Sequence, residues 1–226
     1  MSDFFSFFAR FLPDLLKGAA ITLLLTAQGL IAGFVLGLLA ALARSYGGKF
    51  WRGVAVGYIE LFRGTPLLVQ LFLIYYGLPG LGITLSRELS AFLALGLNSG
   101  AYQAEYLRGS ILAIGDNQMM AGRSIGMSKW RTVWHVVLPQ ALRLAIPAWA
   151  NEPVSLLKST GVVFLIAVPE LMAKAKSIAA RTYDPIGSYL AVAIVYLAMV
   201  YLVDFFLKWL ERASRIPGFE MEGRKA

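Results

Sequence analysis

The sequence predicts an all-α membrane protein with five transmembrane helices and an N-terminal interfacial helix. Hydrophobic residues make up 58% of the 226 positions, and charged residues only 15%. A soluble domain of this length carries about 25% charged residues and about 45–50% apolar ones. The apolar residues also form long runs, several of which reach the roughly 20 residues that a helix needs to cross a bilayer. Both observations place most of the chain in lipid.

The predicted elements follow these runs in order. Residues 1–17 are too charged to span and too aromatic for a linker, which indicates an amphipathic helix at the interface. In the first span, Gly29, Gly33 and Gly37 recur every fourth residue, a pattern that lets membrane helices approach closely, although glycine is frequent in such helices in any case. The five spans are predicted at about 18–43, 54–78, 89–114, 142–168 and 186–209. The transmembrane domain then covers 18–212, with polar connections at 115–135 and 170–184 and a basic tail at 213–226.

Lysine and arginine in the connections predict the orientation. With the N-terminus outside and five spans, the C-terminus lies in the cytoplasm, and most basic residues outside the spans face inward, as the positive-inside rule requires. These inward-facing residues are Arg44, Lys49, Arg52, Arg123, Lys129, Arg131, Lys208, Arg212, Arg215, Arg224 and Lys225. Membrane topology therefore explains the net charge of +8 better than nucleic-acid binding, which needs a basic face with exposed aromatic residues.

Residue patterns that would support catalysis are missing from the sequence. There is no phosphate-binding loop, since Gly47-Gly48-Lys49 is followed by Phe50. His135 is the only histidine and there is no cysteine, so neither a histidine cluster nor a thiolate site can bind a metal. We expect no catalytic residue, no metal site and no cofactor in this chain. The functional classes that remain are a transporter, a channel and a scaffold.

The polar segment at about 117–139 is unusual for a connection between spans. A helix-like stretch precedes Gly126 and Ser128, which are typical of a turn, and an amphipathic stretch follows as far as Pro139. A connection of this length with helical segments of its own is usually functional, and it indicates a docking site for a partner. The alternative is a simple connector.

This segment resembles the coupling-loop motif of binding-protein-dependent ABC importers, E-A-A-x(3)-G-x(9)-I-x-L-P. The spacing from Gly126 to Pro139 matches the motif without a gap. Its leading glutamate is replaced by Met120 and its second alanine by Gly122. A charged contact with the ATPase is therefore expected either to be missing or to be replaced by an apolar contact through Met119 and Met120. The resemblance assigns ATPase coupling to Met120, Ala121, Gly122, Gly126, Leu138 and Pro139.

Further stretches are similar to polar amino-acid permeases of the histidine/glutamine/arginine type. They are Arg63-Gly64-Thr65-Pro66-Leu67-Leu68-Val69-Gln70, Leu138-Pro139-Gln140-Ala141-Leu142-Arg143 and Leu157-Lys158-Ser159-Thr160. The resemblance covers about 18–212 and implies the type I ABC importer transmembrane fold. It also implies alternating access, ABC ATPase subunits that bind ATP and Mg²⁺, an extracytoplasmic amino-acid-binding protein, and a second permease subunit, identical or homologous.

Polar residues inside two predicted spans are candidates for a substrate pocket, because charged groups in a bilayer are costly and usually functional. Spacings of four and three place those of the third span on one helix face. Pro147 and Pro153 loosen the fourth span, and freed carbonyls there can bind substrate. The candidates are Asn98, Tyr102, Glu105, Asn151, Glu152, Ser155 and Lys158. The alternative is that Glu105 and Lys158 pair to hold the bundle together.

Glu152 falls near the middle of the fourth span, where an unpaired carboxylate is expensive. A cationic substrate would relieve this cost, and a guanidinium can donate to both carboxylate oxygens. Similar permeases for arginine or histidine also have Asn-Glu at this position, which favours a basic amino acid. Glutamine, glutamate or another small polar solute such as an opine is the alternative, because Lys158 is close enough in sequence to neutralise Glu152. An ATP-independent carrier or channel would not need the polar segment at 117–139.

Overall fold

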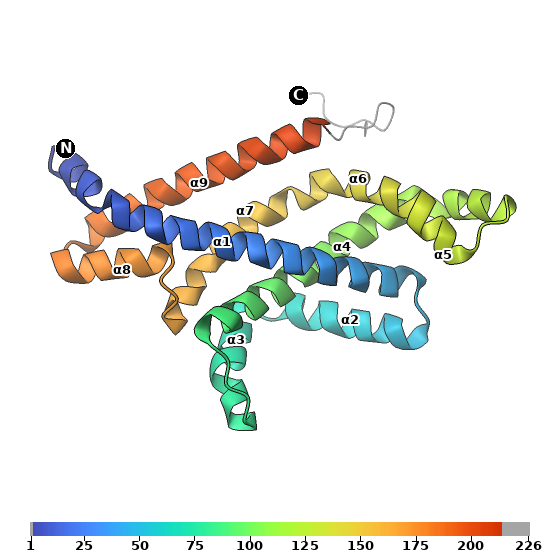
Figure 1. Ribbon diagram of the computed structural model, residues 1–226, viewed down its shortest axis with the longest axis horizontal. Helices are drawn as coiled ribbons and strands as arrows, with labels where there is room; N and C mark the ends of the chain where they lie inside the picture. The colour runs from blue at the N-terminus through green and yellow to red at the C-terminus, as the bar shows by residue number, and fades with distance from the viewer. Residues whose placement is uncertain (1, 214–226) are drawn as a thin grey trace.

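The computed structural model is an elongated helical bundle that describes residues 2–213 (Figure 1). Every regular element in this range is a helix: α1 (Ser2–Tyr46), α2 (Lys49–Gly64), α3 (Leu67–Phe72), η1 (Leu73–Gly77), η2 (Leu78–Leu81), α4 (Arg87–Ser124), α5 (Lys129–Thr132), η3 (Val133–Val137), α6 (Leu138–Trp149), α7 (Asn151–Ser159), η4 (Thr160–Ile166), α8 (Leu171–Thr182) and α9 (Pro185–Ala213). The basic tail from 214 onward, including Arg215, Arg224 and Lys225, lies outside the described residues.

Helix α1 is continuous where the sequence predicts an interfacial helix followed by a separate span. Its apolar stretch of 43 residues corresponds to about 65 Å of helix, roughly twice the hydrocarbon thickness of a bilayer. Pro13 lies inside the helix without ending it. Phe11 and Leu15 are buried in a cluster with residues of α8 and α9, such as Leu171 and Val192. This packing keeps the first turns of α1 in line with the rest of the helix.

The glycine stripe of α1 lies against α4, the helix with which α1 has its most extensive contact. A Cβ atom on Gly33 would lie 2.9 Å from the backbone nitrogen of Gly100, and one on Gly37 would lie 2.9 Å from the backbone nitrogen of Ala104. Real Cβ atoms do not approach so closely, so the two backbones can touch only because these positions lack side chains. The predicted role of the stripe in close helix packing is confirmed.

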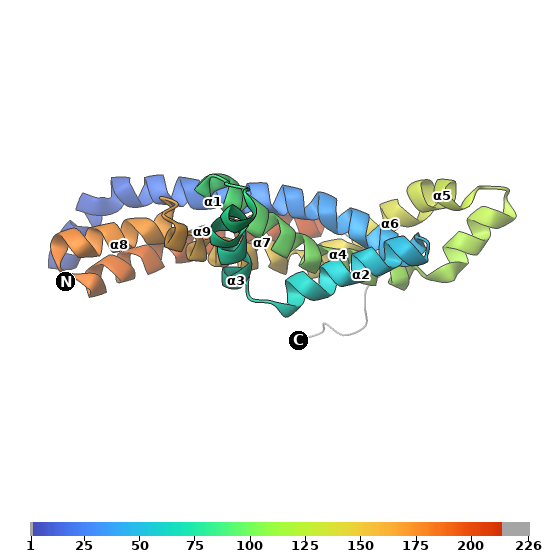
Figure 2. The ribbon, with the colours of Figure 1, turned by 90° about the horizontal axis from the view of Figure 1, so that it is seen from below.

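The expected five spans are only partly recognisable as single helices. Within the described residues, α1 and α9 are long and apolar enough to cross a membrane. The predicted span at 54–78 is instead two helical pieces, Lys49–Gly64 and Leu67–Leu81, which meet at 106°. Thr65 adopts an extended conformation there, with φ −121° and ψ 145°, because the following Pro66 disfavours helical geometry. The second piece projects sideways from the bundle (Figures 1 and 2).

The predicted span at 142–168 is also interrupted. Helices α6 and α7 meet at Ala150, and the 3₁₀ segment η4 ends at Ala167 with φ 61°. The polar connection expected at 170–184 is instead α8, a helix of 12 residues. Glu170 caps this helix by accepting hydrogen bonds from the backbone nitrogens of Met172 and Ala173, both at 2.8 Å.

Glu170 also joins three helices. The Tyr196 hydroxyl of α9 donates to its carboxylate at 3.3 Å, and the Thr22 hydroxyl of α1 does so at 3.4 Å. The carboxylate is fully buried, and these hydroxyl and backbone donors satisfy it without a cation. The end of the bundle that contains α8 is therefore held together around this side chain.

The contact between α1 and α4 leads to a testable prediction. Replacing Gly33 with alanine should destabilise the bundle by about 1–3 kcal/mol, because the added methyl group overlaps α4. For a chain of this length, thermal unfolding in detergent should shift by about 2–4 °C per kcal/mol. The matched control is Gly57→Ala on α2, where a Cβ meets nothing within 4 Å. Equal unfolding temperatures for both variants would contradict the close contact.

Candidate functional site

The segment that resembles a coupling loop occupies one end of the bundle (Figure 1). Helix α4 bends at Gly115, which has φ 71°, and ends at Ser124. Gly126 follows in the left-handed region with φ 84°, and the backbone nitrogen of Met127 donates to the Gly122 carbonyl oxygen at 3.0 Å. The Ser128 side chain then accepts a hydrogen bond from the backbone nitrogen of Arg131 and so caps the start of α5. The turn predicted at Gly126 and Ser128 is present.

A close contact with Thr132 explains why a glycine, Gly122, stands where the motif has its second alanine. A Cβ atom at this position would lie 2.5 Å from the Thr132 Cγ2 atom of α5. The end of α4 and α5 therefore pack more closely than an alanine would allow. Thr132 is fully buried and its hydroxyl donates to the Ser128 carbonyl oxygen at 3.1 Å, which anchors the turn.

The exposed surface of this segment combines large apolar side chains with the basic residues Arg123, Lys129 and Arg131. Ile125 is 79% exposed, and Met120, Trp130 and Trp134 are also exposed. Leu138 is buried, whereas Ala121 and Pro139 are exposed. Large exposed apolar side chains at the end of a bundle are typical of protein–protein contact surfaces.

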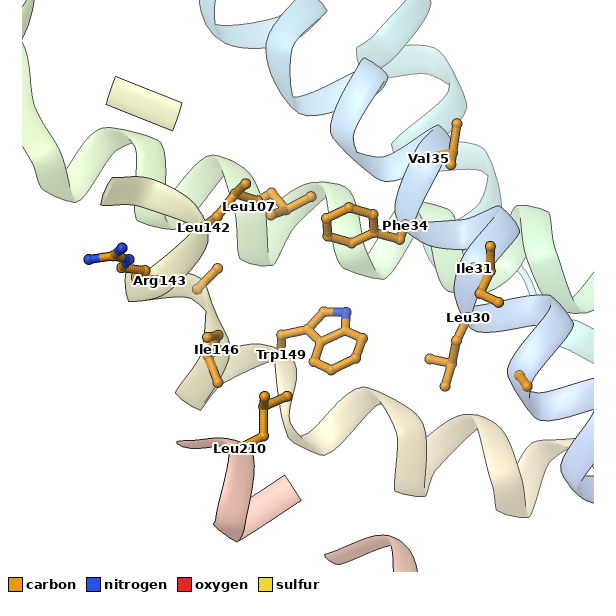
Figure 3. Close-up of a pocket in the computed structure, with 12 residues that line it drawn as sticks. Leu30, Ile31, Phe34, Val35, Leu107, Leu142, Arg143, Ile146, Trp149 and Leu210 are labelled. Carbon is orange, nitrogen blue, oxygen red and sulfur yellow. The ribbon is translucent and has the colours of Figure 1, made fainter. Parts of the chain in front are cut away.

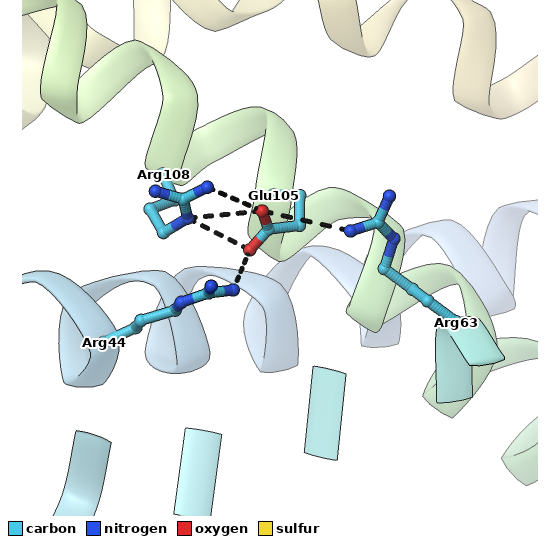
Figure 4. Close-up of polar contacts among 4 residues, drawn as sticks. All are labelled: Arg44, Arg63, Glu105 and Arg108. Carbon is cyan, nitrogen blue, oxygen red and sulfur yellow. Dashed lines mark hydrogen bonds and ion pairs between the residues drawn. The ribbon is translucent and has the colours of Figure 1, made fainter. Parts of the chain in front are cut away.

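Glu105 on α4 is enclosed by three arginines from three helices (Figure 4). Arg108 donates to it at 2.8 Å, Arg44 of α1 also donates, and Arg63 of α2 lies 3.9 Å away. The sequence suggests two roles for Glu105, a pocket acceptor or a partner of Lys158. The structure pairs it with these arginines instead, because α1 and α2 bring their basic ends to this part of α4.

Asn98 and Tyr102 face the broken segment between α2 and α3. Asn98 donates to the Phe62 carbonyl oxygen at 3.2 Å and to the Gln70 side-chain oxygen at 3.0 Å. The amide group of Gln70 donates in turn to the Phe62 and Thr65 carbonyl oxygens at 2.8 and 2.9 Å, which the break leaves without helical partners. The Arg63 guanidinium lies over the Tyr102 ring, 5.3 Å from its centroid.

Glu152 lies on the buried side of α7, whereas the other candidates of that helix are exposed. Its carboxylate is 5% exposed and accepts from the Ser99 hydroxyl at 2.7 Å, with Tyr106 close by. Gln103 donates to Ser99 at 3.0 Å and accepts from the Trp149 indole at 2.7 Å. A buried chain of hydrogen bonds thus runs from Trp149 at the end of α6 through α4 to Glu152.

Asn151, Ser155 and Lys158 form the exposed face of α7. The seven predicted substrate residues therefore do not surround a common cavity in the single chain. Glu152 is inside, three candidates are on the surface of α7, and three lie along α4. Sequence reasoning missed Ser99, Gln103, Tyr106 and Trp149, although the first three lie on the same helix as the α4 candidates. Among the described residues, no three histidine, aspartate or glutamate side chains are placed to hold a metal ion.

The bundle has the fold of the transmembrane subunit of a type I ABC importer. The family model of binding-protein-dependent transport system inner membrane components matches residues 33–216, and the chain belongs to this family. It is the permease subunit of an amino-acid ABC importer, whose ATPase and substrate-binding protein are separate subunits.

Similar proteins support this class. The Glutamine transport system permease protein GlnP of Escherichia coli (strain K12) is 37% identical over 207 residues, which cover 91% of this chain and 94% of that protein. The L-cystine transport system permease protein TcyB of Bacillus subtilis (strain 168) is 41% identical over 203 residues, covering 89% and 87% of the two chains. A crystal structure of an amino acid ABC transporter with histidines has a TM-score of 0.85 and 36% identity, covering 93% of this chain and 98% of that one.

The turn at Gly126 leads to the second prediction. Gly126→Val should cost about 1–3 kcal/mol in local strain, because a β-branched residue tolerates a positive φ badly. We expect the variant to insert normally but to lose binding to its ATPase subunit in a pull-down, together with transport. Gly126→Asn is the matched control, since asparagine adopts this conformation more readily. Normal ATPase binding by Gly126→Val would show that the turn is not needed for coupling.

Proposed function

We propose that this permease imports a polar, basic amino acid across the cytoplasmic membrane by alternating access, while a separate subunit hydrolyses ATP. The observation that supports a basic substrate is the environment of Glu152. This carboxylate is buried, and within the described part of the chain it accepts from hydroxyl groups and has no cationic partner. A buried carboxylate without a cation is costly, and a cationic substrate would supply the missing charge.

The position of Lys158 supports this assignment. Its side chain lies on the exposed face of α7, whereas Glu152 is buried, and no ion pair joins them. Lys158 therefore leaves the charge of Glu152 uncompensated. On the exposed face, Asn151 and Ser155 offer hydrogen-bonding groups for the ammonium and carboxylate that all α-amino acids share. Asn98 and Tyr102 complete the proposed pathway along α4.

A closed pathway requires a second permease subunit, identical or homologous. The piece from α3 to η2 projects away from the bundle and exposes apolar side chains, including Leu73, Tyr76 and Leu81, the last of which is 77% exposed. An apolar arm that projects from the bundle fits an interface between two such chains. The substrate would then lie between the two subunits rather than within one.

The proposed energy coupling depends on two parts of α4, its middle and its C-terminal end. The coupling segment continues this helix, and the arginine cluster around Glu105 ties α4 to α1 and α2. Docking of an ATPase that binds ATP and Mg²⁺ would move these helices as one unit and bias the bundle toward its outward-open state. We propose that this chain itself binds no nucleotide, because its sequence has no phosphate loop.

The alternative substrate is a polar amino acid that is not basic, such as glutamine. It is favoured by the relatives, since GlnP is named for glutamine and TcyB for cystine. Glutamate or an opine belongs to the same alternative. In that case the hydroxyl groups around Glu152 would serve only to satisfy a structural carboxylate.

Uptake by the complex separates these substrates. Reconstituted vesicles should accumulate labelled arginine, histidine or lysine in preference to glutamine and glutamate. Glu152→Gln should remove at least the tenfold preference that about 1.4 kcal/mol of charge pairing supplies. The control is Glu60→Gln, an exposed carboxylate on α2, which should leave the preference unchanged. Preference of the wild type for glutamate, or equal loss of all substrates in Glu152→Gln, would refute the assignment.

Orientation is tested by cysteine labelling, because the natural chain has no cysteine. Ser86 and Ser128 are exposed and lie beyond opposite ends of α4. With the N-terminus outside and the C-terminus in the cytoplasm, as the basic residues predict, Ser86→Cys should react with an impermeant maleimide in intact cells. Ser128→Cys should react only after lysis. The reverse pattern would invert the proposed orientation.

A further inference from the structure

A cavity of about 620 Å³ opens on the side of the bundle between α1, α4, α6 and α9 (Figure 3). Its walls include Phe34 of α1, Ile146 and Trp149 of α6, and Leu210 of α9, and Arg143 is its one charged lining residue. None of the predicted substrate residues lines it. The volume lies within the range of about 300–1,000 Å³ typical of ligand pockets.

The surface around this cavity is suited to lipid. On α1, Ile31 is 68% exposed, and on α9, Phe205 is 76% exposed. Both helices are long and apolar enough to cross a membrane. Bilayer hydrocarbon therefore reaches the mouth of the cavity, and an apolar occupant is favoured there.

The size of the cavity argues against a helix of a second copy as occupant. A helix about 10 Å across fills roughly 400 Å³ per turn. The cavity of about 620 Å³ thus admits only about one and a half turns, far fewer than a spanning helix has. A flexible acyl chain has no such requirement for width.

Arg143 lies at the rim of the cavity, and its guanidinium points away from the apolar side chains of the interior (Figure 3). It is exposed and lies five residues, or about 7.5 Å along the helix, after Leu138 at the coupling end. No ion pair or hydrogen bond engages its guanidinium within the described part of the chain. On α9, by contrast, Lys208 is paired with Asp204 at 2.6 Å. A guanidinium at the edge of an apolar cavity near the end of a bundle can bind a phosphate group.

We propose that this cavity is a binding site for an anionic phospholipid, with one acyl chain between α1, α6 and α9 and the headgroup phosphate on Arg143. The occupant touches the Trp149 ring, whose indole nitrogen donates to Gln103 and is linked through Ser99 to Glu152. The lipid therefore contacts the outer end of the hydrogen-bonded chain that reaches the proposed substrate carboxylate. The site does not depend on which amino acid is transported.

Quenching of tryptophan fluorescence by phospholipids brominated in their acyl chains tests the site. Two full-length proteins each retain one tryptophan, Trp149 in the cavity or Trp209 on the exposed surface of α9, with the other four replaced by phenylalanine. In mixed bilayers, phosphatidylglycerol should quench Trp149 with about fivefold higher relative affinity than phosphatidylcholine, the effect of one basic residue near a headgroup. Trp209 should show no headgroup preference.

Two substitutions test the two halves of the proposal. Arg143→Gln should abolish the headgroup preference at Trp149, whereas Arg123→Gln, an exposed cation at the end of α4, should preserve it. Ala27→Phe adds a ring to the cavity wall and should reduce quenching of Trp149 by both lipids, without changing that of Trp209. Equal quenching of Trp149 by both lipids in the wild-type background would overturn the proposal. So would no quenching by either lipid, which would mean that protein covers the cavity. Neither result bears on transport by the complex.

Discussion

The close contact between α1 and α4 is the constraint on which the rest of the molecule depends. Gly33 and Gly37 let the backbone of α1 touch that of α4 at Gly100 and Ala104. Membrane helices gain little from apolar burial against one another, so close packing between small residues has to supply the association. Because α4 is held along this line, its polar residues lie within reach of α1 and of the other helices around it.

The polar side chains of α4 then make contacts with the helices around it. Asn98 braces the break before α3, Ser99 reaches Glu152 of α7, and Glu105 gathers arginines from α1 and α2. Each contact satisfies a group that would be expensive to leave unpaired in a bilayer. The same helix continues past its bend at Gly115 into the coupling segment, so the proposed contacts to substrate and to the ATPase lie on one element.

The family assignment and the coupling turn were accessible to sequence reasoning because they depend on local chemistry. A glycine at position 126 and a serine at 128 produce a turn and a helix start whatever surrounds them. The same is true of Pro66, although the sequence-based expectation of a single span at 54–78 did not take it into account. Helix α8 was missed because its N-cap, Glu170, is stabilised by Thr22 and Tyr196 from distant parts of the chain. The continuity of α1 was missed for a similar reason, since contacts with α8 and α9 outweigh the charged residues of its first turns.

The sequence by itself determined that this chain is helical, membrane-spanning and a member of an importer family, because composition, run length and motif spacing are properties of the chain alone. It also identified Glu105 and Glu152 as unusual. Only the tertiary structure decided that Glu105 is surrounded by Arg44, Arg63 and Arg108, whereas Glu152 has no cationic partner among the residues that the structure describes. The charge on a carboxylate is known from its residue type, but its partners depend on which helices pack together. In this bundle that packing follows from the absence of side chains at Gly33 and Gly37 of α1.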